Sequence, residues 1–268
     1  MRNIKKEFSG VKALDGITFD VYAGEIHCLV GENGAGKSTL MKCLFGIYSK
    51  DSGQILLNGK EVSFKTSKEA LEHGVAMVHQ ELNQALKRSV MDNIWLGRYP
   101  RIKLGGAKMP FVSDKAEYDM TMEVFKDLNF EKFGININPR TIMSTMPVSR
   151  RQMVEIAKAV SHNTKLLILD EPTAVLTPQE TEKLFTVLRN MRDQGKSIII
   201  ITHKLNEVLA LSDRVSVLRK GKYIGTVETK NATAESLTEM MVGEKIDLNI
   251  ERPDPVNPVK RLVIENLS

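Results

Sequence analysis

The chain has 268 residues, of which 42% are apolar and 26% charged, a globular composition that argues against intrinsic disorder. Its formal net charge is +5, but the basic residues are scattered and form no cluster beyond pairs such as Lys5-Lys6, so the charge alone does not indicate nucleic acid as a partner. No run approaches the ~18 consecutive apolar residues of a membrane span. Cys28 and Cys43 cannot form a metal site by themselves and fit small core residues in a reducing compartment.

Short β segments are predicted through the first 80 residues of the chain. Each either alternates apolar and polar side chains or is a short apolar run bounded by turn residues. They cover residues 16–21, 26–30, 54–57, 60–64 and 74–78. Asn58-Gly59 joins the third and fourth segments, and an Asn-Gly pair between two such runs predicts a β-hairpin.

A glycine-rich loop, G-E-N-G-A-G-K-S-T at residues 31–39, separates the strand at 26–30 from a helical pattern. Glycines let backbone N–H groups turn inward around phosphate oxygens, and the helix N-terminus adds the positive end of its dipole. In such a loop Lys37 reaches the β- and γ-phosphates, and the Ser38 hydroxyl ligates Mg²⁺. The alternative, a turn without a ligand, is the weaker interpretation given strand, loop, Lys-Ser and helix together. The candidate phosphate-binding residues are Gly31, Asn33, Gly34, Ala35, Gly36, Lys37, Ser38 and Thr39.

The character of the chain changes from about Leu82 to Asn163, where helical periodicity dominates and long apolar strand-like runs disappear. This region predicts an inserted helical lobe, with helices over residues 116–128 and 152–160. Strand character then returns, and Thr177 with Glu180 three residues later predicts the start of a helix. The remaining predicted elements are strands at 165–169, 197–202, 213–218 and 223–227, and helices at 178–194 and 204–211.

Polar side chains follow the predicted strands at their carboxyl ends, where ligands sit in open α/β sheets. Asp170 would hold Mg²⁺ together with Ser38, and Glu171 can act on an attacking water as general base. His203 follows the strand at 197–202 and could contact the γ-phosphate and that water. Gln80 ends the strand at 74–78 and can touch metal or water. Taken singly, each of these residues could equally be a solvated strand end; their common position favours one site.

The C-terminal tail predicts a linker and the start of a repeat. Residues 252–258 are proline-rich and polar, the composition of a semi-rigid linker. They lead into residues 261–268, in which Glu265-Asn266-Leu267 resembles Arg2-Asn3-Ile4 near the start. A linker followed by a second copy of the first strand suggests a tandem protein cut after its first half.

These motifs in this order resemble the nucleotide-binding subunit of an ATP-binding cassette (ABC) transporter, and the resemblance covers essentially the whole chain. The runs at 10–14, 77–82 and 89–94 are similar to monosaccharide importer ATPases of the ribose, galactose and xylose type, which carry two cassettes in one polypeptide. The resemblance implies an α/β fold: an ABC-type P-loop NTPase with a RecA-like parallel-sheet core, an antiparallel β subdomain and an inserted α-helical subdomain.

The same resemblance divides the chain into successive parts. The β subdomain and the first part of the core take residues 1–82, the helical subdomain 83–163, and the rest of the core 164–245. The linker would be 246–260, and 261–268 would begin a second cassette.

By this resemblance, individual positions acquire roles. Phe8 matches the aromatic residue that stacks on adenine, although it could equally be a core residue of the β subdomain. Gln80 matches the loop that faces the membrane-embedded partner, Glu171 the catalytic base and His203 the switch histidine.

The signature motif of the family, Leu-Ser-Gly-Gly-Gln, is altered here. The matching stretch contains Pro147, Val148 and Ser149, and proline removes both a hydroxyl and an N–H donor where the family has serine. Val148 adds bulk where the pattern has glycine. Since each composite site pairs one cassette's phosphate loop with the other's signature, these departures predict one hydrolytic site and one weak site.

The resulting expectation is an ATPase, with ATP and Mg²⁺ as cofactors, that powers sugar import from the cytoplasmic face of the membrane. Expected partners are a second cassette, integral membrane permease subunits and, indirectly, a periplasmic or extracellular sugar-binding protein; no nucleic acid is expected. One alternative is a soluble ABC ATPase acting on nucleic acid or ribosomes, which the dispersed basic charge disfavours. Another is a P-loop kinase, which the Asp170-Glu171 pair disfavours because it suits water as the acceptor.

Overall fold

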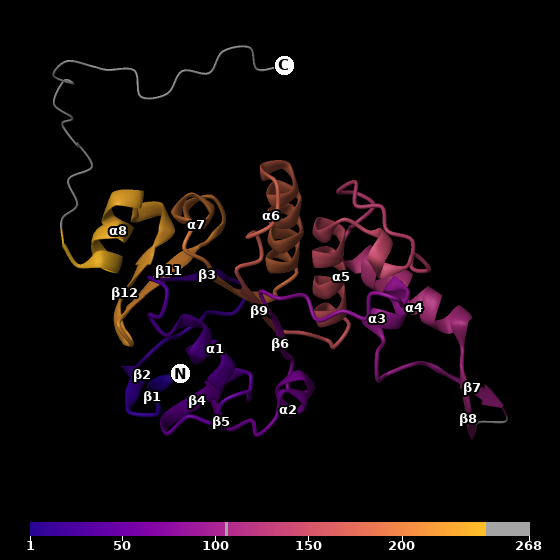
Figure 1. The fold of residues 1–268 in the computed structure, drawn as a ribbon, viewed down its shortest axis with the longest axis horizontal. Coiled ribbons are helices and arrows are strands. Elements are labelled where there is room, and N and C mark those ends of the chain that lie inside the picture. The colour runs from indigo at the N-terminus through magenta and orange to yellow at the C-terminus, as the bar shows by residue number, and fades with distance from the viewer. Residues whose placement is uncertain (105–106, 245–268) are drawn as a thin grey trace, which may run out of the picture.

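The computed structural model describes residues 1–104 and 107–244, which form two β-sheets flanked by helices and a lobe to one side of them (Figure 1). The predicted linker at 246–260 and the predicted repeat of the first strand at 261–268 lie outside the described residues. Within the described part, no helix has the length and apolar character needed to cross a bilayer.

The central sheet has six strands in the order β12-β11-β3-β10-β9-β6. The pairs from β11 to β6 are parallel, and the edge strand β12 is antiparallel to β11. Parallel strands covered on both faces read as nearly continuous apolar runs, which explains the strand predictions made from such runs. The strands are β3 (Ile26–Val30), β6 (Val75–Val78), β9 (Leu166–Asp170), β10 (Ser197–Ile201), β11 (Arg214–Arg219) and β12 (Lys222–Glu228).

Helices cover both faces of this sheet. Successive side chains of a strand point to opposite faces, so each buried strand places apolar side chains on both. Leu29, Ile168 and Ile199 pack into the core on the side of α1 (Lys37–Leu44) and the second sheet. Their neighbours in the strands pack on the other side, in the core that holds the helices from the rest of the chain. Those helices include α5 (Val148–Val160), α6 (Pro178–Asp193), α7 (Leu205–Leu211) and α8 (Ala234–Val242).

The second sheet is antiparallel, in the order β2-β1-β4-β5. The predicted hairpin is confirmed: Asn58 and Gly59 both have positive φ, as a two-residue turn requires. The strand predicted at 16–21 is wrong beyond Ile17: Phe19 still exchanges two backbone hydrogen bonds with Met1, but residues 18–21 are not in a strand. The members are β1 (Arg2–Phe8), β2 (Val11–Ile17), β4 (Ser52–Leu57) and β5 (Lys60–Val62), and the short helix α2 (Ser67–Glu72) follows them.

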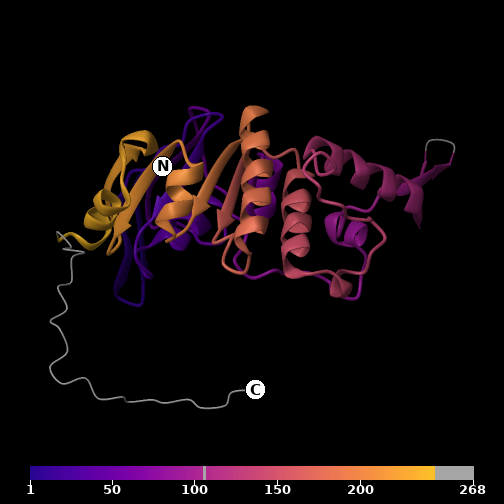
Figure 2. The ribbon, with the colours of Figure 1, turned by 90° about the horizontal axis from the view of Figure 1, so that it is seen from above.

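The lobe is mainly helical, as predicted, and extends sideways from α5 (Figure 2). Ser89 and Asp92 form a capping box at the start of α3. The lobe also carries a β-hairpin at its far end, which the sequence pattern did not indicate. Its elements are α3 (Val90–Ile94), β7 (Arg101–Leu104), β8 (Ala107–Val112), α4 (Asp114–Asp127) and the 3₁₀ turn Met143–Thr145.

Helix α6 starts at the predicted place. Thr177 accepts the N–H of Glu180, and the Glu180 carboxylate accepts the N–H of Thr177 in return. Pro178 occupies the first helical position, where its missing N–H costs nothing. After β12, a 3₁₀ turn (Thr229–Asn231) leads into α8. The limits of the predicted domains stay predictions.

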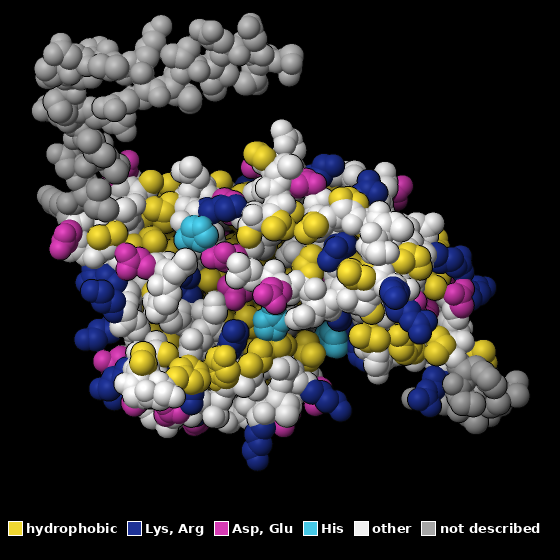
Figure 3. Space-filling model, in the orientation of Figure 1, with side chains coloured by type: hydrophobic (Ala, Val, Ile, Leu, Met, Phe, Trp, Pro, Cys, Tyr) yellow, Lys and Arg dark blue, Asp and Glu magenta, His cyan; other side chains and the backbone are white. Residues whose placement is uncertain are grey.

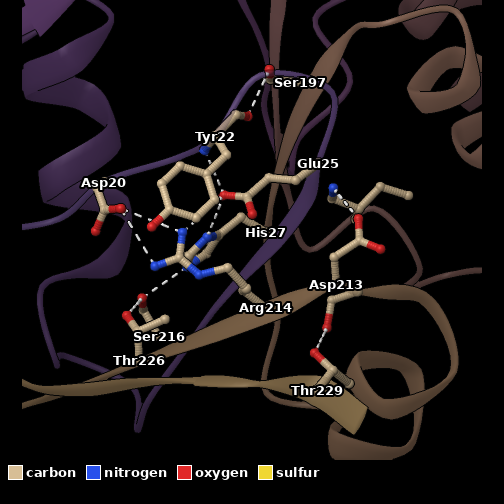
Figure 4. Close-up of polar contacts among 12 residues, drawn as sticks. Asp20, Tyr22, Glu25, His27, Ser197, Asp213, Arg214, Ser216, Thr226 and Thr229 are labelled. Atoms are coloured by element: carbon tan, nitrogen blue, oxygen red, sulfur yellow. Dashed lines mark hydrogen bonds and ion pairs between the residues drawn. The ribbon is translucent and has the colours of Figure 1, made fainter.

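A buried polar cluster ties the N-terminal ends of the sheet strands together (Figure 4). The Glu25 carboxylate accepts the N–H of Tyr22 at 2.7 Å and lies 3.0 Å from Nδ1 of His27. On the other side of the ring, Nε2 lies 2.8 Å from the Ser216 hydroxyl of β11. The Arg214 guanidinium lies 3.4 Å from Glu25 and stacks over the Tyr22 ring. Strand β3, which leads into the glycine-rich loop, is therefore fixed to β11 through paired side chains.

Candidate functional site

The predicted site residues meet at the opposite, carboxyl end of the sheet strands. Because β3, β10, β9 and β6 are parallel neighbours, the residues that follow them share one edge. Acidic, basic and histidine side chains lie close together near the middle of this face of the molecule (Figure 3). A cavity of about 410 Å³ opens there. It is lined by Ala13, Asn33, Gly34, Ala35, Gly36, Lys37, Ser38, Thr39, Gln80, Asp170, Glu171, Ile201 and His203.

The glycine-rich loop presents backbone donors to this cavity. Gly36 caps α1 with φ of 101°, and no side chain caps the helix, so its first N–H groups are available to a ligand. A side chain at Gly36 would place its Cβ 2.7 Å from the Ala13 carbonyl oxygen, and one at Gly31 would lie 2.2 Å from that of Leu218. At Gly34 no atom lies within 4 Å of such a Cβ, so the loop faces open space at that residue. The loop therefore forms a cradle that is closely packed at Gly31 and Gly36 and open at Gly34.

Lys37 lies almost fully buried within the loop. Its ammonium donates to the carbonyl oxygens of Gly31 at 2.7 Å and Glu32 at 2.9 Å. Burial lowers the pKa of Lys37, while the negative charges of Glu171 and Asp170 act in the opposite direction. These contacts fix a cation beside the cradle, where it complements an anionic ligand.

Asp170 and Ser38 supply the oxygen atoms at the base of the cavity. Burial raises the pKa of Asp170, and a hydrogen bond from Ser38 opposes that shift. Within the described residues, no three His, Cys, Asp or Glu side chains form a metal site by themselves. A few hard oxygen ligands beside a phosphate cradle fit Mg²⁺, which keeps several waters and takes few protein ligands.

Glu171 lies between His203 and Gln80. One carboxylate oxygen is 2.9 Å from Nδ1 of His203, and the other accepts from the Gln80 amide at 3.4 Å. The backbone of Glu171 is left-handed, with φ of 47°, and its N–H donates to Ile201 of the neighbouring strand. A non-glycine residue held in this region is strained, and such strain concentrates at functional sites. The arrangement directs the carboxylate toward the cavity, where it can accept a proton.

Phe8 does not line this cavity. It lies on β1, where its ring meets that of Tyr48 edge-on at 5.2 Å, with the Lys6 ammonium at 5.2 Å from its centre. Its stacking on a base stays a prediction. Conversely, Ala13 and Ile201 line the cavity but were not predicted, since only the packing of β2 and β10 against the loop places them there.

The altered signature stretch also lies apart from the cavity. Pro147 occupies the N-cap position of α5 without a side-chain cap, and Val148 is 41% exposed. Hydrogen bonds from Ser149 and from Thr177 hold the pKa of Glu180 below its usual range. None of the three predicted signature residues contributes to the lining of this chain's own cavity.

The sequence matches the family model described as ABC transporter over residues 14–174. The chain belongs to the ABC transporter family. The cassette is also similar in fold to solved structures. A nucleotide-free ATP-binding cassette from an ABC transporter superimposes with a TM-score of 0.74 at 22% identity, covering 91% of this chain and 94% of that one. The ADP conformation of MJ1267, an ATP-binding cassette, gives 0.76 at 26% identity over 91% and 97% of the two chains.

Two relatives in sequence carry the name galactose/methyl galactoside import ATP-binding protein MglA. That of Clostridium perfringens strain 13 is 51% identical over 268 residues, which is 100% of this chain and 50% of that protein. That of Escherichia coli K12 is 49% identical over 265 residues, or 99% and 50%. The cassette thus spans about half the length of the relatives it matches.

Proposed function

We propose that this cassette binds and hydrolyses ATP to power the import of a monosaccharide through separate membrane permease subunits. The observation that carries the proposal is the gathering of Lys37, Asp170, Glu171, Gln80 and His203 around one cavity beside the phosphate cradle. The names of the relatives, which are import proteins for galactose and methyl galactoside, support the sugar class. They give no support to a role on nucleic acid.

The chemistry assigned to the site is transfer of the γ-phosphoryl group to water. The loop N–H groups and Lys37 would hold the phosphates and offset their charge. Glu171 would accept a proton from the attacking water. His203 and Gln80, which both contact its carboxylate, would keep it aimed at the cavity. The His203 side chain is half exposed, so this side of the cavity is open to solvent.

Ser38 and Asp170, with Gln80 at the cavity edge, would hold Mg²⁺. When bound, this ion would neutralise charge on the β- and γ-phosphates. The raised pKa of Asp170 reflects an environment in which an ionised carboxylate lacks enough positive charge, and a cation would supply it.

A second cassette would complete this site. Because Pro147, Val148 and Ser149 lie away from the cavity at the exposed start of α5, they would face a nucleotide held by the partner cassette. Proline offers no N–H there, so the partner's nucleotide would lack a donor. The assembled pair would then hydrolyse ATP mainly at the site built on this chain's Lys37 and Glu171.

A groove beside the lobe offers a place for a permease segment. It has a volume of about 1370 Å³ and is lined by residues of β5 and α2 and by the turn after α3. Leu96 in that turn is 51% exposed, a large apolar side chain without full cover. Strand β6 starts at Val75, directly after Gly74 of this groove, and ends at Val78, two residues before Gln80 of the cavity. Strand β6 would thus connect the proposed permease contact to the proposed site. The cassette would lie on the cytoplasmic face of the membrane.

The import function is tested by measuring ATP hydrolysis by the assembled transporter with and without a sugar-loaded binding protein. Stimulation by the loaded binding protein is expected. No stimulation by any monosaccharide-loaded binding protein would refute the import role. Leu96→Glu should abolish copurification with the permease while leaving nucleotide binding intact. Val11→Glu, at an exposed apolar position of β2, is the matched control and should keep the permease bound.

A further inference from the structure

A polar cluster outside the cavity joins the two segments that carry Glu171 and His203. It consists of Thr173, in the loop that follows β9, and of Lys204 and Glu207, at the start of α7. Thr173 comes two residues after Glu171, and Lys204 directly follows His203. None of the three cluster residues lines the nucleotide cavity, so any effect they have on chemistry there must pass through their neighbours.

The Lys204 ammonium finds its acceptors within this cluster. It donates to the carbonyl oxygen of Thr173 at 2.9 Å and to the Thr173 hydroxyl at 3.2 Å. It also lies 3.1 Å from one carboxylate oxygen of Glu207, and the other oxygen accepts the Thr173 hydroxyl. An ammonium has three N–H donors, so each of them has an acceptor here. The three residues thus form a closed ring of charge-assisted hydrogen bonds.

Three contacts in succession join the loop after β9 to the segment after β10. The Glu171 N–H donates to the Ile201 carbonyl at 2.9 Å, and the Glu171 carboxylate lies 2.9 Å from Nδ1 of His203. The third contact is that of Lys204 with Thr173. The backbone of Glu171 is left-handed, and a strained conformation of this kind persists only where the surrounding contacts hold it.

The third contact is the one anchored in the protein interior. Thr173 is 2% exposed, whereas the His203 side chain is 52% exposed. In the described part of the chain, the His203 ring has no hydrogen-bond partner other than Glu171. Packing therefore does little to fix this ring, and its place depends on the backbone on either side of it, which Lys204 ties to Thr173.

We propose that Lys204 is a positioning residue for hydrolysis. Through Thr173 it holds the loop after β9 against the start of α7, so that the Glu171 carboxylate stays in contact with His203 and faces the cavity. This role rests on the proposed hydrolysis at the site. It should affect turnover and not nucleotide binding, since Lys37 and the phosphate loop lie on other elements.

The test is Lys204→Met in the assembled transporter, because methionine keeps a long side chain and removes the ammonium. The kcat for ATP should fall about tenfold, since a displacement of about 1 Å at a reacting group can cost about 10²-fold. The KM and the dissociation constant for ATP should stay within about twofold of the parent values. Lys204→Arg should restore most of the turnover, because a guanidinium can donate to the Thr173 carbonyl and to Glu207 together.

Lys230→Met is the matched control. Lys230 also pairs with a carboxylate, that of Glu228 at 2.9 Å, but its side chain is 76% exposed and lies in the 3₁₀ turn before α8. The turnover of this control should equal that of the parent. Thermal unfolding shows whether each variant is folded. If Lys204→Met does not fold, Thr173→Val decides: it removes one hydroxyl at nearly constant shape and should lower kcat about threefold.

A double variant separates positioning from stability. With His203→Ala the contact that Lys204 maintains is already absent, so adding Lys204→Met should lower kcat by less than about threefold more. A full tenfold loss in that background would overturn the proposal, as would equal turnover of Lys204→Met and the parent. Loss of ATP affinity in proportion to kcat would also overturn it. Unchanged hydrolysis in Glu171→Gln would instead refute the proposed site itself, and the role of Lys204 with it.

Discussion

The two ends of the central sheet differ in how well their buried carboxylates are paired with other groups. At the N-terminal end, the Tyr22 N–H, the His27 ring and the Arg214 guanidinium all contact one oxygen of the buried Glu25 carboxylate (Figure 4). At the carboxyl end, Asp170 is equally buried, but burial still raises its pKa because its partners do not offset the lost hydration. One buried carboxylate is paired within the chain, and the other would gain its missing partner from a bound cation.

From this difference we infer that the N-terminal end contributes mainly to stability and the carboxyl end mainly to function. A paired polar cluster fixes the position of β3 and adds nothing that a ligand could use. The open end keeps donors, a cation and carboxylates in place around a cavity, at the expense of folding free energy. Substitutions at the two ends should therefore separate into those that change unfolding and those that change chemistry.

The largest effect is expected at the open end, for Glu171→Gln. The amide keeps the size of the side chain but cannot accept the proton of the attacking water, so hydrolysis by the assembled transporter should fall by about 10²–10⁴-fold. Binding of ATP should persist, since Lys37 and the loop are unchanged. Phosphate release and nucleotide binding are measured on the same preparation. Unchanged hydrolysis would remove Glu171 from the role of base.

The largest loss of stability is expected at the closed end, for His27→Leu. The substitution removes the side-chain partner between Glu25 and Ser216 and leaves a buried carboxylate and a buried hydroxyl short of bonds. The free energy of unfolding should fall by ~3 kcal/mol, measured by denaturant titration. Nucleotide affinity of the folded protein should stay the same.

The control for that variant is His73→Leu, at an exposed histidine that follows α2. Its effect should stay within about 0.5 kcal/mol, as for most surface substitutions. A loss at position 27 no larger than the loss at position 73 would mean that the cluster contributes little to stability.

The same two ends differ in how far the sequence predicts them. The open end follows from local sequence. Each apolar strand is followed directly by a polar site residue, as Leu169 is followed by Asp170, and parallel pairing brings these strand ends together. The strands, the loop and the cap at Thr177 could therefore be predicted without a structure. The left-handed backbone of Glu171 could not, because nothing in its residue type indicates it.

The closed end depends on long-range pairing that no local pattern carries. His27 and Ser216 are 189 positions apart, and only the register of β3 beside β11 brings them together. The strand predicted at 16–21 extends too far for a related reason, since the alternation continues past Ile17 although the strand ends there. Local periodicity predicts elements, but it does not predict which remote groups will satisfy them.

A smaller, pH-dependent effect is expected in the lobe. Within the described residues, the Glu117 carboxylate of α4 has no set of hydrogen-bond and ion-pair partners like the one around Glu25. Its side chain is 2% exposed, one carboxylate oxygen lacks a hydrogen bond within the described structure, and burial raises its pKa to about 7, with Asp92 and Asp114 adding to the shift. A carboxyl with a raised native pKa holds its proton more tightly when folded. Its stabilising contribution is therefore full at acid pH and is lost as the pH rises through about 7.

Glu117→Gln should remove this loss, because the amide does not ionise. Relative to the parent chain, the variant should gain roughly 2 kcal/mol of unfolding free energy on going from pH 5 to pH 8. Glu123→Gln, at an exposed position on the same helix, should show no such gain. Denaturant unfolding at both pH values gives the comparison. Parallel pH profiles for the parent and the Glu117 variant would contradict the assignment.

The smallest expected effect distinguishes the two ends most directly. Replacing a buried acid by its amide should raise the stability at one end and lower it at the other. Asp170 has a raised native pKa, so its ionisation costs stability as the pH rises, and Asp170→Asn should stabilise the nucleotide-free protein at pH 8 by about 1 kcal/mol. Ser38 can still donate to the amide oxygen, while Mg²⁺-dependent nucleotide binding should weaken. Glu25→Gln should instead destabilise by about 1 kcal/mol, because it removes the charge that Arg214 and His27 approach. Thermal unfolding of the two variants without nucleotide measures both signs. If the two variants shift the midpoint in the same direction, pairing does not distinguish the ends, and the open end is not held at a cost to folding.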